Sequence, residues 1–65
     1  MGMTELLKEF WLYKGKQLQI NINGLMVDVQ VLDLRQVWNR VDAKVTPVRG
    51  NGEVWVEARR LIQPI

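Results

Sequence analysis

The chain of 65 residues contains few side chains that can do chemistry. It has no His and no Cys, so the commonest general base, thiolate nucleophiles, thiolate zinc sites and disulfides are excluded. Ser is also absent, and the hydroxyl groups of Thr4, Tyr13 and Thr46 have no His partner. The seven carboxylates include no spaced Asp/Asn loop that would bind a cation through oxygen. We therefore expect no enzymatic activity, no cofactor, no metal and no small-molecule substrate.

The cations of the second half of the chain are the next candidates. Residues 1–34 carry three Lys against four carboxylates, whereas residues 35–65 carry six Lys or Arg against three. A Trp flanked by cations on a sheet surface can stack a nucleic-acid base and hold its phosphates. The net charge of +2 is nevertheless low for a nucleic-acid-binding protein. The candidate residues for contact with nucleic acid or a partner are Arg35, Lys44, Arg49, Trp55, Arg59 and Arg60.

The elements that position these residues begin with a short amphipathic helix. Thr4 is a suitable N-cap and Gly15 a suitable stop, which places the helix within residues 4–14. So short a helix is unstable alone in water and must be docked. The sequence leaves open whether it docks on its own sheet or on that of a neighbouring copy. Its docking or interface residues, apolar and at helical spacing, are Leu6, Leu7, Phe10 and Trp11.

After the helix the apolar period changes to two, which indicates strands. Asn23–Gly24 is the strongest short signal for a two-residue hairpin turn. That turn pairs Ile22 with Leu25 and Ile20 with Val27, so that one face of the hairpin is apolar. We expect this face to be buried.

The second strand is long, and its apolar phase slips by one residue, which predicts a β-bulge. A following turn at Asn39–Arg40 places Trp38 on the inner face opposite Val41. The same register places Arg35 opposite Lys44 on the outer face. Like charges in that position destabilise a sheet, so something else is expected to favour this pair.

The chain as a whole predicts a mainly β fold in a single domain, residues 1–65. A third turn is expected within residues 50–52, and it puts Val54 and Val56 on the inner face and Trp55 on the outer face. One helical turn precedes a last strand at Leu61–Ile62. Five short strands then form a bent antiparallel meander over residues 16–63. Closing such a meander into a small barrel is the usual way to remove exposed sheet edges.

The strand spacing and the run Gly50-Asn51-Gly52-Glu53-Val54-Trp55-Val56 resemble SH3-like small barrels, including bacterial SH3-like, KOW and Tudor-like modules. The resemblance covers residues 16–63. The stretch from Val45 to Val56 is also similar to small proteins of phage and mobile elements. These resemblances imply a five-stranded SH3-like barrel behind the N-terminal helix.

Two interpretations of an outward Trp55 remain open. In the first, the N-terminal helix or a second subunit covers it, together with Val37 and Val48. In the second, Trp55 faces a ligand. The first favours an interaction or assembly module that buries its helix and Trp-rich surface against itself or a protein partner. The alternative is a nucleic-acid-binding small barrel that uses its basic outer face. No apolar run is long enough to span a membrane, and we expect a cytoplasmic protein.

Overall fold

The β1–β2 hairpin has the predicted register. The structure is a computed structural model that describes residues 5–63. β1 (Gln17–Ile22) and β2 (Leu25–Val37) are joined by Asn23 and Gly24, whose φ angles of 52° and 87° define a type I′ turn. The Gly24 N–H donates to Asn21 Oδ1 at 2.9 Å. Ile22 lies opposite Leu25, as expected.

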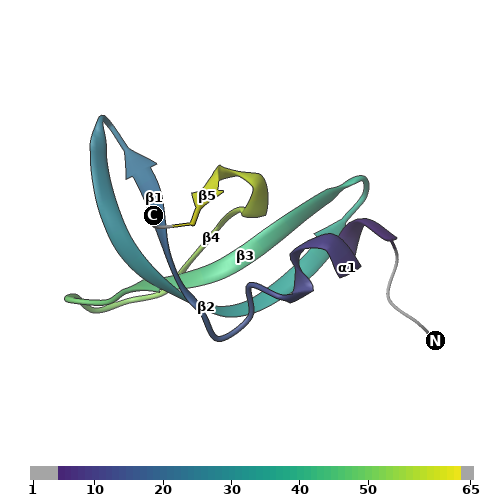
Figure 1. Ribbon diagram of the computed structural model, residues 1–65, viewed down its shortest axis with the longest axis horizontal. Helices are drawn as coiled ribbons and strands as arrows, with labels where there is room; N and C mark the ends of the chain where they lie inside the picture. Colours follow the sequence, from purple (N-terminus) through teal and green to yellow (C-terminus); the bar gives the residue numbers. More distant parts are fainter. Residues whose placement is uncertain (1–4, 64–65) are drawn as a thin grey trace.

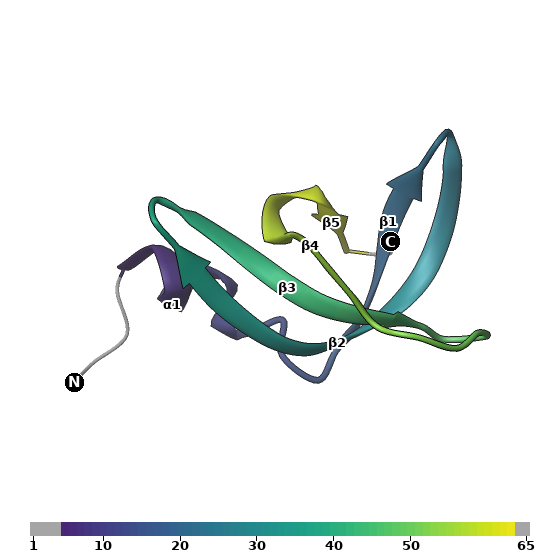
Figure 2. The same cartoon turned by 180° about the vertical axis from the view of Figure 1, so that it is seen from behind.

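The predicted bulge is confirmed within β2. Its pairing with β3 (Arg40–Pro47) shifts by one residue between Val31 and Asp33, so that Leu32 is the extra residue. The bulge bends β2, and one long strand serves two hairpins. These hairpins project toward opposite ends of the molecule (Figures 1 and 2).

The predicted turn at Asn39–Arg40 is wrong by one residue. The turn is formed by Trp38 and Asn39, because Val37 pairs with Arg40. Trp38 is therefore not an inner-face residue: it sits at the hairpin tip with 91% of its surface exposed.

The change of register also corrects the predicted pair of like charges. Arg35 lies opposite Asp42, and Lys44 lies opposite Asp33. Opposite charges across an antiparallel pair stabilise it, whereas Arg35 opposite Lys44 would destabilise it. The predicted register places Trp38 on the inner face and the observed one does not, and the charge pairs favour the observed register.

The remaining strands complete one antiparallel sheet in the order β4-β3-β2-β1-β5. β4 (Val54–Glu57) pairs with β3 after a loop longer than the turn predicted within residues 50–52, and Val54 and Val56 share the face of Val45, as predicted. The predicted helical turn is the 3₁₀ turn η1 (Ala58–Arg60), which leads into β5 (Leu61–Ile62). No described pairing joins β4 to β5, so the sheet has two edges and is not closed.

The helix α1 (Glu5–Trp11) packs against the core of its own chain. It ends three residues before the predicted limit at residue 14, and Thr4, the predicted N-cap, lies outside the described residues. The Gly15 N–H donates to the carbonyl of Val31 at 2.8 Å, which ties the end of the helical segment to β2. The four predicted docking residues, all partly buried, contact the core: Leu6, Leu7, Phe10 and Trp11.

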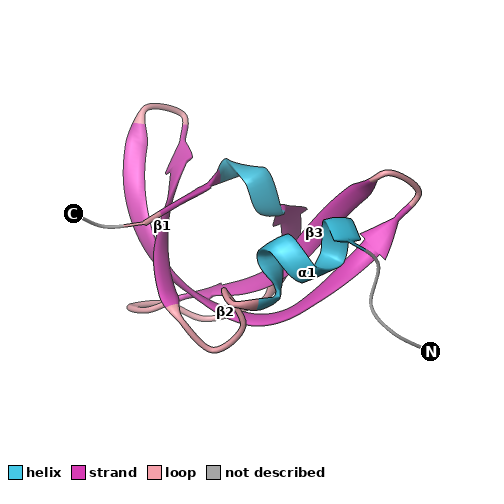
Figure 3. Cartoon of the chain, turned by 45° about the vertical axis from the view of Figure 1, so that its right-hand side comes forward, coloured by secondary structure: helices cyan, strands magenta, loops and turns pink. Residues whose placement is uncertain are grey.

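The core lies on the concave side of the bent sheet, where α1 and η1 also lie (Figure 3). The core consists of small and medium apolar side chains from all the strands except β4, with one from η1: Leu18, Ile20, Val29, Val31, Leu34, Val41, Ala43, Val45, Ala58 and Leu61.

No helix in the described part of the chain is both long and apolar enough to cross a membrane.

Candidate functional site

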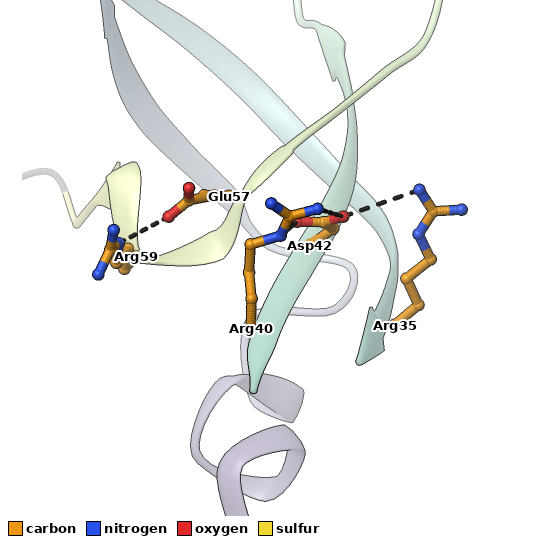
Figure 4. Close-up of polar contacts among 5 residues, drawn as sticks. All are labelled: Arg35, Arg40, Asp42, Glu57 and Arg59. Carbon is orange, nitrogen blue, oxygen red and sulfur yellow. Dashed lines mark hydrogen bonds and ion pairs between the residues drawn. The ribbon is translucent and has the colours of Figure 1, made fainter. Parts of the chain in front are cut away.

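The outer face of the sheet carries an ion-pair cluster centred on Asp42 (Figure 4). Asp42 is only 6% exposed. Its Oδ1 lies 3.1 Å from Arg40 Nε, and its Oδ2 lies 3.7 Å from an Arg35 guanidinium nitrogen. The two half-exposed guanidinium groups therefore enclose one buried carboxylate, and their charge is partly neutralised within the chain.

Trp55 belongs to the same face, and Arg35 covers it. The Arg35 guanidinium carbon lies 4.0 Å from the centroid of the Trp55 ring, which is a close cation–π contact. The helix packs on the opposite face of the sheet, against the core, so α1 does not cover Trp55, and its cover by a second subunit stays a prediction. The Arg35 guanidinium covers one face of the Trp55 ring, and a nucleic-acid base that stacks on the ring would need this face.

The other predicted contact residues are scattered, and most are engaged. Lys44 Nζ lies 3.1 Å from Glu53, and Arg59 Nε lies 2.6 Å from Glu57. Arg60 donates to the carbonyl of Asn21 at 3.0 Å. Arg49, in the loop after β3, is exposed and has no ion pair within residues 5–63. The structure does not bring these cations together in one free patch.

A cavity of about 420 Å³ lies between α1, the start of β3, the end of β4 and η1, and Arg40 of the Asp42 cluster is part of its rim. The apolar part of its wall comes from Leu6 and Phe10 of the helix and Val41 of β3. Its rim has charges of both signs, and the charged and polar residues there are Glu9, Asn39, Arg40, Glu57 and Arg59.

Trp38 lies at the tip of the β2–β3 hairpin (right-hand side of Figure 1), directly before residues that line this cavity. Asn39 and Arg40, the residues that follow it, line the cavity, but Trp38 does not. Its φ of 59° lies in the left-handed region, which an L-residue with a bulky side chain rarely adopts. The Gln36 side-chain amide donates to its carbonyl at 2.8 Å and supports the turn.

The charges of β2 and β3 are a sequence signal for the position of Trp38. A turn at Trp38–Asn39 pairs opposite charges across β2 and β3, whereas the expected turn pairs like charges. The charge pairs therefore predict that Trp38 lies at the hairpin tip and not in the core. The cavity itself depends on how α1 crosses the sheet, which local sequence patterns do not specify.

A second exposed apolar group lies at the tip of the β1–β2 hairpin, at the far end of the molecule. Ile22 and Leu25 continue the inner apolar rows of β1 and β2 beyond the core, and at 45% and 70% exposed they correct the expectation that this face of the hairpin is buried along its whole length. Met26, on the other face, is also exposed. Met26 also lines a second cavity, of about 260 Å³, which is smaller than the one beside α1.

The described residues hold no group of three or more acidic side chains arranged to bind a metal ion. Comparisons of the chain with family models, curated proteins and solved structures found no match. The resemblances to SH3-like modules and to small phage or mobile-element proteins therefore stay predictions. What the chain does must be inferred from its own surface.

Proposed function

We propose that this chain is a non-enzymatic, cytoplasmic interaction module that contacts a protein surface through Trp38 and the adjoining cavity. The observation that carries the proposal is the placement of Trp38, 91% exposed and in a left-handed backbone conformation. Within the described chain this side chain adds almost nothing to the core, while its backbone conformation opposes folding.

An unfavourable residue at an exposed tip is best explained by what it contacts outside the chain. Left-handed backbone costs an ordinary L-residue about 1–2 kcal/mol, and Asn or Gly would avoid most of that cost. Trp is the residue type most enriched among those that dominate the binding energy of protein interfaces. Backbone strain of this kind clusters at binding sites, which supports a role for Trp38 as a contact residue.

The sheet supplies the support that such a contact needs. The SH3-like small barrel is part of this proposal, because the observed strand order and the bent β2 are what such a barrel requires. The bulge fixes the direction of the β2–β3 hairpin, and the Asp42 cluster joins β2 to β3 near its tip.

The nucleic-acid alternative has less support from the described surface. Arg35, Lys44 and Arg59 each have a carboxylate partner within 4 Å. Phosphate binding would have to displace these partners, and Trp55 would have to release Arg35 before it could stack fully on a base.

The experiment compares three immobilised forms of the chain as baits in an extract of the source cells. The wild type is compared with Trp38→Asn, which removes the contact and suits a left-handed position, and with Leu12→Asn. Leu12 is 73% exposed just after α1 and lies outside the cavity, so it controls for the loss of an exposed apolar side chain. We expect the wild type and Leu12→Asn to capture the same protein, and Trp38→Asn to lose it. Capture that is independent of Trp38 contradicts the proposal.

A further inference from the structure

The cavity and the exposed Trp38 lie on one end of the same molecule, and this placement suggests a specific occupant. We infer that the cavity accepts Trp38 from a second copy of this chain, in a reciprocal two-fold dimer. The inference rests on the proposed function, because it identifies the protein surface that Trp38 contacts.

The cavity has the size and lining that an indole side chain requires. Its volume of about 420 Å³ is in the range of sites that enclose small organic groups, roughly 300–1,000 Å³. Leu6, Phe10 and Val41 provide apolar and aromatic contacts for the ring. The carboxylate of Glu57 and the side-chain amide oxygen of Asn39 are both acceptors on the rim that suit the indole N–H.

Trp38 does not fill the cavity of its own chain. It does not line the cavity, although the next two residues, Asn39 and Arg40, do. The left-handed turn carries the side chain outward, where it is 91% exposed. A side chain held away from a neighbouring cavity can fill the same cavity on another copy.

The arrangement also satisfies the symmetry of a closed dimer. In a two-fold contact the same patch faces itself, so a protruding residue and its cavity must lie close together on one surface. Here the cavity wall begins at Asn39, the residue after Trp38, at the tip of the same hairpin. The rim carries the exposed carboxylate of Glu9, whereas its cations Arg40 and Arg59 pair with Asp42 and Glu57 of the same chain, so opposite charges meet across the contact only if one of these cations is shared.

The area involved indicates a weak dimer. A Trp side chain buries about 150–250 Å², so two of them and the two cavity walls that they cover bury about 600–1,000 Å². Stable interfaces bury about 1,200–2,000 Å². The dimer is therefore expected to dissociate on dilution, and it must be measured over a wide range of protein concentration.

The test uses purified full-length chain and measures its mass by sedimentation and light scattering. We expect the wild type to change from monomer to dimer as its concentration rises. Trp38→Asn should weaken the association by at least about thirtyfold, as expected for a residue that dominates an interface. Glu9→Tyr, which places a ring over the cavity from an exposed helix position, should weaken it similarly, and Leu12→Asn should leave it unchanged.

Mixing the two defective variants tests the reciprocal geometry directly. Trp38→Asn keeps an open cavity and Glu9→Tyr keeps Trp38, so a mixture restores one of the two contacts. We expect the mixture to form a heterodimer at concentrations at which each variant alone is monomeric. A mixture that stays monomeric, or a Trp38→Asn variant that dimerises like the wild type, overturns the inference.

The outcomes separate this inference from the proposed function. A wild type that is monomeric at every concentration, but whose capture of another protein depends on Trp38, overturns the dimer and leaves the proposed function standing. Mass and capture that are both independent of Trp38 overturn both. Loss of the dimer in Leu25→Asn, but not in Trp38→Asn, overturns the inference and places the interface at the β1–β2 tip.

Discussion

Trp38 and Asn23 occupy comparable places in two different hairpins, yet their residue types are opposites. Both are the first residue of a two-residue turn, and their φ angles are 59° and 52°. Asn is among the few residues that tolerate this conformation, whereas Trp is not. Asn23 therefore suits the backbone conformation of its turn. Trp38 does not suit its own, and its large side chain lies in solvent.

Replacing Trp38 by Asn should stabilise the monomer. We expect Trp38→Asn to raise the free energy of unfolding by about 0.5–1 kcal/mol, because it relieves the left-handed strain and removes almost no buried surface. The measurement is urea denaturation at low protein concentration, where association does not contribute. Asn23→Ala is the matched change at the other turn and should lower the free energy by about 1 kcal/mol. A loss of stability in Trp38→Asn would show that the ring packs within the monomer.

Asp42 is the buried charge on which the outer face depends. We expect Asp42→Asn to lower the free energy of unfolding by about 1–2 kcal/mol, because two guanidinium groups lose their carboxylate but remain half exposed to water. Asp33→Asn is the control, since Asp33 is exposed and its ion pair with Lys14 spans 3.7 Å. Its effect should stay within about 0.5 kcal/mol. Equal effects of the two substitutions in urea denaturation would contradict a special role for Asp42.

At the scale of elements, α1 is a helix of seven residues without a fully buried side chain. It is held by four partly buried apolar residues and by the tie between Gly15 and Val31. Lys14 adds a cation–π contact 4.8 Å from the centroid of the Trp11 ring. The docking of α1 therefore depends on its side-chain contacts with β2 and β3.

Removing the Trp11 ring should undock the helix. We expect Trp11→Ala to lower the free energy of unfolding by about 2–3 kcal/mol, less than for a fully buried Trp because Trp11 is only partly buried. Leu12→Ala, one residue further along and mostly exposed, should change it by less than about 0.5 kcal/mol. The difference between the two midpoints of urea unfolding is the readout. Similar midpoints would show that α1 contributes little to stability.

The two hairpins of β2 show which elements can be predicted from sequence. Asn23–Gly24 fixes the first register because only a few residue types fit a type I′ turn. The second register was predicted wrongly because neither Trp38 nor Asn39–Arg40 carries a strong turn signal, and because the large apolar side chain of Trp38 fits the inner-face pattern of a strand. The bulge was found because it shifts the apolar pattern itself. The partners of the cations were missed because they depend on register and on the loop that brings Glu53 to Lys44.

At the scale of the whole molecule, the distribution of charge limits any nucleic-acid affinity. The sequence alone predicts about three to four released counterions. Of the predicted contact residues, only Arg49 and Arg60 lack a carboxylate partner within the described chain. The folded surface should therefore neutralise about two phosphates rather than five.

Salt dependence measures this number. We expect the affinity for a short single-stranded oligonucleotide to fall with salt with a log–log slope of about −1.4, as for two neutralised phosphates. Arg49→Gln should halve that slope. Fluorescence anisotropy of a labelled oligonucleotide provides the measurement. A slope of about −3.5, as for five neutralised phosphates, would mean that the paired cations leave their carboxylates, and it would restore the nucleic-acid alternative.

The pairing of β5 with β1 also affects the order in which the molecule folds. The other described strand pairs join strands that are neighbours along the chain. Leu61, in contrast, pairs with Ile20, and most of the chain lies between these two residues. Closing so long a loop is entropically unfavourable until the intervening hairpins exist, so β5 should join after the folding transition state. Leu61→Ala should then speed unfolding and leave the folding rate nearly unchanged in stopped-flow experiments. The two-residue strand, with Arg60 bound to Asn21, would thus set how long the folded molecule persists rather than how fast it forms.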